Sequence, residues 1–368
     1  MITEVSTHAV RVLTEMGTKR PPGGDRTAMD ERKIRILQAI IDDYILTAIP
    51  VGSRTISKRY DMGLSSATIR NEMSDLEELG YLDQPHVSAG RVPSAKAYRL
   101  YVDELLREGK LKTDDVHSIR EHFQNRSGKM EDVISRAAQV LSSLTSYTSL
   151  AMGPKGAEMI IRNLQLVPIS AHSALLVIVT DGGIIRDSVI HVDSELDSDA
   201  LYAISRMLTE RVAGRTLGET QQVLKSVRKE SAEKRSVIDS IAKLVAQAQA
   251  SGSQANIAFA GPSNILNFPE YSDVEKARGF LSLLETKDAI LSLLEQRQSV
   301  AFTVRIGPET GVKELEDCSV VTATYTLDNG TNGTIGVIGP TRMQYGRVLG
   351  ILGAMGQQLS SVLNEDKE

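Results

Sequence analysis

Residues 64–94 read LSSATIRNEMSDLEELGYLDQPHVSAGRVPS, and this stretch decides the fold expected for the N-terminal part of the chain. Ser65 is a good N-cap, because a serine hydroxyl accepts a hydrogen bond from a free backbone N–H of the first helical turn. The apolar positions that follow it are spaced so that they form one narrow stripe, and Gly80 then ends the pattern. These positions are Ile69, Met73, Leu76 and Leu79. The stretch therefore predicts an amphipathic helix whose other face is small and polar at its N-terminal end.

Two further helices are expected before this one. Apolar residues recur at three- and four-residue spacings over residues 30–45, and the pattern stops before Pro50. A second, shorter helix is expected to begin with Ser53 as its N-cap and to run to Tyr60. The three helices would pack through their apolar stripes into one small core.

A β-hairpin is expected directly after the third helix. Residues 81–84 and 91–93 are strand-like, and residues 85–90 between them contain the proline and glycine of a loop. Three short helices followed by a hairpin are the arrangement of a winged helix-turn-helix, in which the third helix enters the major groove of DNA. We therefore assign residues 29–93 to a DNA-binding domain of this kind.

The candidate DNA-binding residues lie on the second and third helices and on the hairpin. Arg70 and Asn71 suit guanine and adenine edges, Ser66 and Thr68 suit bases or backbone, and the remaining cations suit phosphates. The alternatives are a capped surface helix in an ordinary three-helix domain and, for the hairpin residues, a solvated loop tip. The full set is Ser53, Arg54, Lys58, Arg59, Ser66, Ala67, Thr68, Arg70, Asn71, His86 and Arg91.

The charge of the chain supports this assignment only locally. The net charge is −5, which by itself gives no sign of nucleic-acid binding. Residues 53–60 and 86–100, however, each carry three Lys or Arg and no acidic residue. Phosphate binding responds to clustered cations, because each neutralised phosphate releases condensed counterions.

The rest of the chain predicts an α+β body with an insert. A linker helix is expected over residues 94–110, and strand-like segments lie on both sides of a helical stretch. This pattern predicts one α+β domain, residues 111–195 and 256–368, interrupted by a mainly helical insert at 196–255. Because two or three helices of this size bury little surface alone, the insert is expected to pack against its copy in a second subunit.

Five blocks of this sequence closely resemble the HrcA family of heat-inducible transcription repressors. They are residues 50–60, 64–94, 97–103, 261–288 and 333–348. The resemblance implies a winged helix, a GAF-like α+β domain and an inserted dimerising domain. It also implies a homodimer that binds an inverted-repeat operator before groE and dnaK genes and is released by heat, with the GroE chaperonin helping it to fold. Two segments depart from the family pattern, residues 1–28 and Gly307–Thr310, and neither is expected to touch the DNA-reading blocks.

Several other classes of protein find no support in the sequence. No apolar run is long enough to span a bilayer and no secretory signal is evident, so we expect a cytoplasmic protein with no membrane contact. Residues 1–28 lack a sustained apolar period, so we expect a disordered leader there. Cys318 is the single cysteine and is expected to be a small buried residue. Gly333, Gly336 and Gly339 lack the context of a phosphate loop and are expected in strands and turns. We expect no cofactor, metal or catalytic site; the alternative function is a repressor controlled by a small metabolite in the GAF-like domain.

Overall fold

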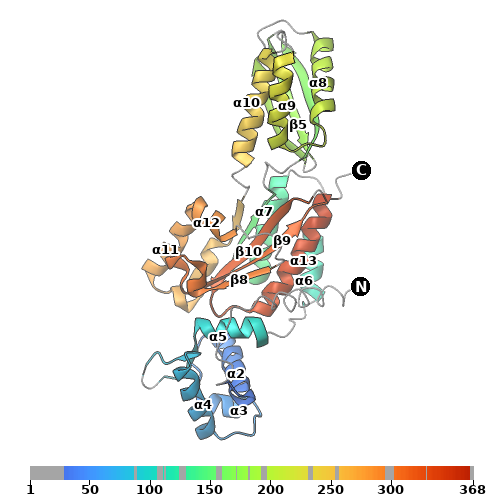
Figure 1. The fold of residues 1–368 in the computed structure, drawn as a ribbon. Helices are drawn as coiled ribbons and strands as arrows, with labels where there is room; N and C mark the ends of the chain where they lie inside the picture. Colours follow the sequence, from blue (N-terminus) through green and yellow to red (C-terminus); the bar gives the residue numbers. More distant parts are fainter. Residues whose placement is uncertain are drawn as a thin grey trace.

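The computed structural model describes most of the chain after residue 28 and forms three bodies in a row (Figure 1). The expected leader at residues 1–28 lies outside the described residues, as do the last five residues of the expected linker helix. The described residues are 29–86, 89–105, 111, 113–123, 130–154, 160–170, 172–180, 183–191, 197–230, 235–252, 257–294, 302–328 and 330–364.

The N-terminal body, here called the reader, contains the three expected helices and the hairpin. These are α2(Glu31–Thr47), α3(Ser53–Arg59), α4(Ser66–Glu78) and the strands β1(Leu82–Asp83) and β2(Val92–Pro93), which pair antiparallel. Ser65 caps α4 as predicted, since its hydroxyl accepts a hydrogen bond from the backbone N–H of Thr68 at 3.1 Å. The prediction that Ser53 caps α3 is wrong: Gly52 has the extended backbone of the capping position, and Ser53 is already helical and buried.

The hairpin is attached to the loop between α2 and α3. Val51 and Arg91 exchange two backbone hydrogen bonds of 2.9 Å. The neighbouring Gly90 has no room for a side chain, because a Cβ atom there would lie 2.5 Å from the backbone of Val51. The absence of a side chain at residue 90 therefore permits the close approach that fixes the base of the hairpin.

The middle body is built on an antiparallel sheet of order β7-β3-β10-β9-β8 with helices on both faces (Figure 1). One face packs against α7 and α13, and the other against α11 and α12. The elements are α6(Thr113–His122), α7(Met130–Thr145), β3(Thr148–Met152), β7(Ile257–Ala260), α11(Val274–Glu285), α12(Lys287–Leu294), β8(Phe302–Ile306), β9(Cys318–Thr326), β10(Asn332–Pro340) and α13(Tyr345–Asn364).

The three glycines with the superficial look of a phosphate loop all lie in strand β10, as predicted. Two of them lie under aromatic rings. A Cβ atom on Gly333 would overlap the ring of Tyr325, and one on Gly339 would lie 2.6 Å from the ring of Tyr147. These glycines therefore serve the packing of the sheet.

The third body corrects the predicted domain division. Strands expected to belong to the α+β domain form a separate sheet, β4(Ile161–Ser170), β5(Ser173–Thr180) and β6(Gly183–His191). This sheet shares its own apolar core with α8(Ser198–Val212), α9(Leu217–Glu230) and α10(Arg235–Gly252). The helical stretch is present as predicted, but it buries its apolar stripes against these strands. The reasoning that the helices needed a second subunit for burial was therefore wrong.

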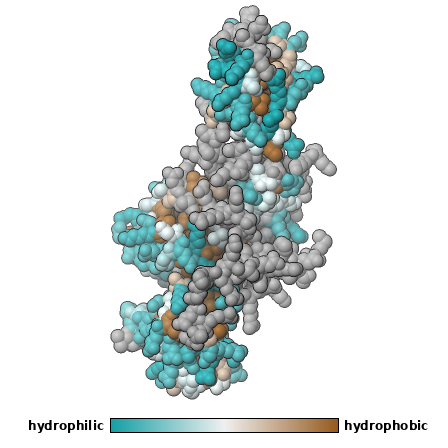
Figure 2. Space-filling view, viewed as in Figure 1, coloured by the Kyte–Doolittle hydropathy of each residue, from teal (hydrophilic) through white to brown (hydrophobic). Residues whose placement is uncertain are grey.

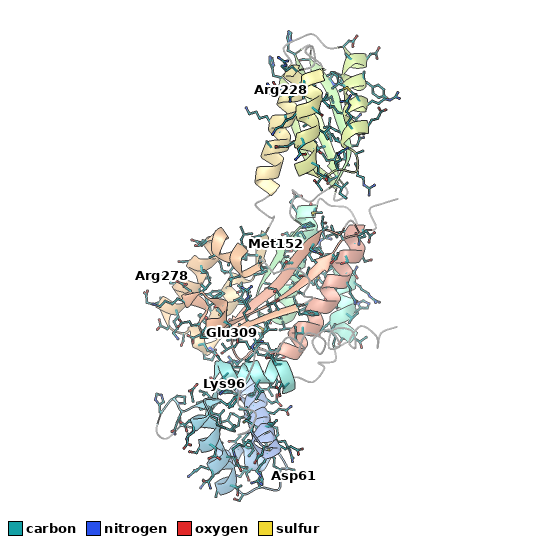
Figure 3. All side chains as sticks on the ribbon, in the orientation of Figure 1. Asp61, Lys96, Met152, Arg228, Arg278 and Glu309 are labelled. Atoms are coloured by element: carbon teal, nitrogen blue, oxygen red, sulfur yellow. The ribbon has the colours of Figure 1, made fainter. Side chains whose placement is uncertain are left out.

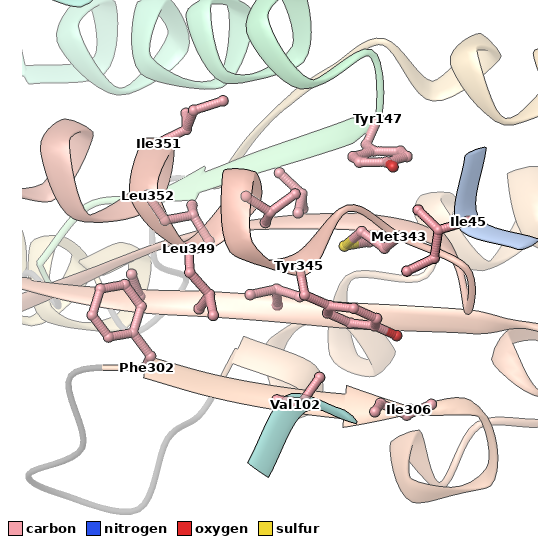
Figure 4. Packing of buried hydrophobic residues seen from close by; sticks show 14 of the residues in the cluster. Ile45, Val102, Tyr147, Phe302, Ile306, Met343, Tyr345, Leu349, Ile351 and Leu352 are labelled. Carbon is pink, nitrogen blue, oxygen red and sulfur yellow. The ribbon is translucent and has the colours of Figure 1, made fainter. Parts of the chain in front are cut away.

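A linker segment joins the reader to the middle body. It consists of α5(Ala95–Leu100) and a π-helical turn, η2(Tyr101–Leu105). Buried residues of the reader and of the middle body belong to one continuous apolar core, in which Ile45 and Val102 lie near Ile306, Met343 and Tyr345 (Figure 4). The reader is therefore seated on the body through a packed interface.

The departing segment Gly307–Thr310 lies at this junction. Glu309 accepts a hydrogen bond of 3.0 Å from the guanidinium of Arg99 on α5, and Ala95 lies 3.7 Å from the position of a Cβ atom on Gly307. Figure 3 shows Glu309 beside the linker helix that carries Lys96. This segment was expected not to touch the DNA-reading blocks, and its contacts here are with Ala95 and Arg99 of the linker helix α5.

Candidate nucleic-acid interface

The N-terminal half of α4 presents the surface expected of a recognition helix. Ala67, Arg70 and Asn71 are exposed, while Ser66 and Thr68 are half-buried. Ile69, Met73 and Leu76 on the opposite face are buried against the other helices. Helical periodicity thus separates a small, polar outer face from an apolar inner one.

Three of the cations in the predicted DNA-binding set are available to an external anion. Arg54 and Lys58 are exposed on α3, and Arg70 is exposed on α4. Within the described residues, no hydrogen bond or ion pair engages any of the three side chains. The surface of the reader in Figure 2 is largely hydrophilic, as a surface that meets DNA should be.

Arg59 is not available in the same way. Its guanidinium pairs with the carboxylate of Asp43 on α2, whose side chain is only 6% exposed. A nearly buried carboxylate needs such a partner, because an unpaired buried charge is strongly destabilising. Arg59 therefore ties α3 to α2, although its side chain is 57% exposed.

Arg91 is likewise engaged within the reader. Its Nε donates to Glu77 Oε2 of α4 at 2.8 Å, its second nitrogen lies 2.8 Å from the same oxygen, and its side chain is 18% exposed. The pair joins the hairpin to α4. Of the hairpin residues predicted to meet DNA, His86 is exposed near the loop tip.

Several charged residues that sequence reasoning did not single out position α4. Glu72 on α4 is 8% exposed and lies 2.9 Å from Lys33 and 3.2 Å from Arg32, both on α2. Lys33 also lies 3.0 Å from Asp75, and these two carboxylates raise the pKa of Lys33. An acidic residue within the apolar stripe of a helix, as Glu72 is, was the sequence signal that could have revealed this contact.

Lys96 completes the support of the hairpin. Its ammonium donates to the backbone carbonyl of Leu79 at 2.8 Å and lies 4.3 Å from the centre of the Tyr81 ring. A cation at the C-terminal end of α4 is favourable, because the last carbonyls of a helix lack partners there. Lys96 was counted with the local basic cluster, and its exposed ammonium group is engaged by Leu79 and Tyr81.

The described residues contain no grouping of three or more His, Cys, Asp or Glu with the geometry of a metal site. Cys318 is buried as predicted, its Sγ lies 2.8 Å from the hydroxyl of Tyr271, and burial raises the pKa of its thiol to about 12. A thiol with so high a pKa is unreactive at neutral pH. Over the part of the chain that is described, no helix combines the length and apolar character needed to cross a membrane.

Comparison with known proteins identifies the family. A sequence profile described as HrcA protein C terminal domain matches residues 131–349. The chain is 43% identical over 341 residues to the heat-inducible transcription repressor HrcA of Clostridium tetani, covering 92% of this chain and 97% of the relative. The chain belongs to the HrcA family. It is therefore a heat-inducible transcription repressor and not an enzyme, as the resemblance predicted.

Further HrcA relatives and one solved structure agree with this identification. The HrcA of Bacillus pumilus is 37% identical over 341 residues, with 91% of this chain and 98% of the relative covered. A solved structure described as a crystal structure of a hypothetical protein at 2.2 Å resolution superposes with a TM-score of 0.62 at 25% identity, covering 92% of this chain and 99% of that one. The fold of this HrcA chain therefore has a counterpart over nearly its whole length.

Proposed function

We propose that this HrcA protein represses heat-shock chaperone operons of the groE and dnaK type by binding an inverted-repeat operator as a homodimer. The observation that carries the proposal is the outer face of α4, where Arg70 and Asn71 project beside the small residues Ser66, Ala67 and Thr68. The major groove is about 12 Å wide and admits one helix with such a face. A winged helix-turn-helix with this helix in the groove is the binding mode that we infer.

The phosphate contacts are assigned to the cations that have no partner within the described protein. Arg54 and Lys58 on α3 would hold the backbone on either side of the groove, and His86 would meet it from the hairpin. Arg59 and Arg91 were predicted for the same task, but their carboxylate partners favour a positioning role. Ser53 is buried, which favours a structural role for it as well.

The homodimer is assigned to the outer face of the three-stranded sheet. Val167 of β4 and Val189 of β6 both pair in register with Leu175 of β5, so the three side chains lie side by side. Val167 is 39% exposed, Val189 61% and the nearby Ile169 56%. The other face of the same sheet is buried against α8 and α10, which leaves this apolar face for a second copy.

The alternative of control by a small metabolite gains no support from the interior of the middle body. Its five-stranded sheet, which we assign to a GAF-like domain, is covered on both faces by buried apolar side chains within the described residues. Leu150, Val320 and Ile338 fill one side, and Ala151 and Val337 fill the other. We therefore propose heat release of the repressor, with the GroE chaperonin as its folding partner, in place of a metabolite switch.

The test is a fluorescence anisotropy titration of a labelled inverted-repeat duplex beside a scrambled duplex, at several salt concentrations. We expect Lys58→Ala to weaken binding to both duplexes and to reduce the slope of log K against log salt by about 1. Arg70→Ala should instead reduce the preference for the inverted repeat. Arg206→Ala is the matched control, since Arg206 is an exposed cation on α8, far from the reader.

Two outcomes would contradict the assignment. If Arg70→Ala keeps the wild-type preference between the two duplexes, this residue does not read bases. If the folded wild-type protein binds the two duplexes equally, operator recognition by this surface is wrong.

A further inference from the structure

Arg342 joins the reader to the middle body at a point that the DNA-binding motif does not include. It lies in the turn between β10 and α13, and its side chain is only 11% exposed. Its guanidinium holds the carboxylate of Glu270 through two contacts, Nε to Oε1 at 2.5 Å and a terminal nitrogen to Oε2 at 3.2 Å. The other terminal nitrogen points to the backbone carbonyl of Ile45 at 3.4 Å.

The contact with Ile45 is chemically suited to the end of a helix. Ile45 lies in the last turn of α2, where carbonyl groups lack partners within the helix and the helix dipole favours a cation. The guanidinium also lies 5.6 Å from the centre of the Phe268 ring, which stacks on Tyr147. Arg342 is thus held by a carboxylate and a ring of the body while it donates to the first helix of the reader.

A second arginine makes a reciprocal connection from the linker helix to the body. Arg99 of α5 donates to the backbone carbonyl of Val304 at 2.6 Å and pairs with Glu309. Tyr101 in the following turn donates to Asp42 of α2 at 3.0 Å. Arg342 therefore connects the body to α2 directly, and Arg99 connects it to the linker that Tyr101 joins to α2; two such connections resist rotation of the reader against the body, which one connection alone would permit.

We propose that Arg342, held by Glu270, is a specificity-determining residue for operator binding, because it fixes the direction of the reader and so the half-site spacing that the dimer accepts. This inference rests on the proposed function, namely that two readers bind one inverted repeat. From the clamp at Ile45, α2 extends back to Glu31, about 21 Å at 1.5 Å per residue. A rotation of roughly 9° about this point moves the far end by about 3.4 Å, the length of one base-pair step. Free rotation at this clamp, which consists of Glu270, Arg342 and the carbonyl of Ile45, would therefore let one dimer accept several half-site spacings.

The experiment measures the Kd for inverted-repeat duplexes with spacers of different length and for a single half-site. The variants are Arg342→Gln and Glu270→Gln, which remove the same clamp from its two sides. Arg278→Gln is the matched control, because Arg278 forms an exposed ion pair with Glu275 on α11 and touches no part of the reader. Near-ultraviolet circular dichroism and sedimentation establish that each variant is folded and dimeric.

We expect the wild-type protein and Arg278→Gln to lose about 100-fold in affinity when the spacer changes by one base pair, as bivalent binding fails when geometry forbids it. Both clamp variants should lose less than about tenfold under the same change, with an unchanged Kd for the half-site. A positioning role predicts this pattern, whereas a purely structural defect would weaken the half-site as well.

The outcomes separate this inference from the function on which it rests. Clamp variants that keep the wild-type spacer preference would overturn the role of Arg342 and leave the proposed function intact. If Arg342→Gln does not fold, Glu270→Gln decides the same question, since it keeps the arginine but removes the carboxylate that holds the guanidinium against the Ile45 carbonyl. Wild-type protein that binds the inverted repeat no better than one half-site would overturn the dimeric function itself.

Discussion

Two neighbouring tyrosines at the junction of the reader and the body should respond in opposite ways to loss of the hydroxyl. Tyr98 on α5 and Tyr345 at the start of α13 are each about 1% exposed, and their ring centres lie 6.2 Å apart. The hydroxyl of Tyr345 lies 2.6 Å from the Ser319 hydroxyl and donates to the carbonyl of Thr341 at 2.6 Å. The hydroxyl of Tyr98 has no hydrogen-bond partner among the described residues.

The magnitudes follow from this difference. Tyr345→Phe removes two hydrogen bonds, each contributing about 0.5–1.5 kcal/mol, so the free energy of unfolding should fall by about 1–3 kcal/mol. Tyr98→Phe removes a buried polar group that gains nothing in return, so the free energy of unfolding should stay the same or rise by about 1 kcal/mol. Both substitutions keep the ring and therefore the apolar packing.

The assay is urea-induced unfolding of the wild type and both variants, followed by circular dichroism. The third body has its own apolar core and can unfold separately from the rest of the chain. The stabilities are therefore compared for the unfolding transition that the near-ultraviolet signal of the buried tyrosines reports. A fall in stability for Tyr98→Phe as large as that for Tyr345→Phe would refute the reasoning, because it would show that the Tyr98 hydroxyl is bonded in the folded protein.

Three further predictions address other parts of the molecule. Gly90→Ala should displace the hairpin and cost roughly 1–3 kcal/mol of stability together with operator affinity, whereas Gly52→Ala, whose nearest neighbour would be 4.0 Å away, should bind normally in the same anisotropy assay. Because burial raises the pKa of Cys318 from 9.0 to about 12, the unfolded chain releases this proton first as pH rises; the urea midpoint should therefore fall between about pH 9 and 12, and Cys318→Ala should reduce that fall. Val189→Glu on the exposed sheet face should shift the dimer to monomers in sedimentation, while Tyr202→Glu, which changes a 68% exposed residue on α8, should not; equal behaviour of the two would remove the support for the dimer face.

The local elements of the reader could be predicted from the sequence because their causes lie close together in the chain. The Ser65 cap and the stripe of Ile69, Met73 and Leu76 fall within about three turns of one helix, and the structure contains that helix as predicted. The Ser53 cap failed for an equally local reason, since a neighbouring glycine occupied the capping position. The family could also be recognised from the sequence, because its motifs are runs of adjacent residues.

The division of the strands between two sheets was decided only by the tertiary structure. Strands β3 and β4 follow one another in the chain, yet β4 pairs with the next strand, β5, whereas β3 pairs with β7 and β10, which come after the whole third body in the sequence. Strand pairing depends on backbone partners that are distant in the chain, and a pattern along one strand does not name its partner.

The partners of the arginines in the reader could not be predicted from the sequence either. The sequence by itself determined the helices of the reader, the exposed polar face of α4 and the family, since these depend on neighbouring residues. Arg54 and Arg70 remain open to an external anion, while Arg59 is taken up by Asp43, 16 residues away, and Arg91 by Glu77, 14 residues away. Only the tertiary structure could decide which cation meets a carboxylate, because an ion pair is set by distance in space and its strength falls with that distance whatever the separation along the chain.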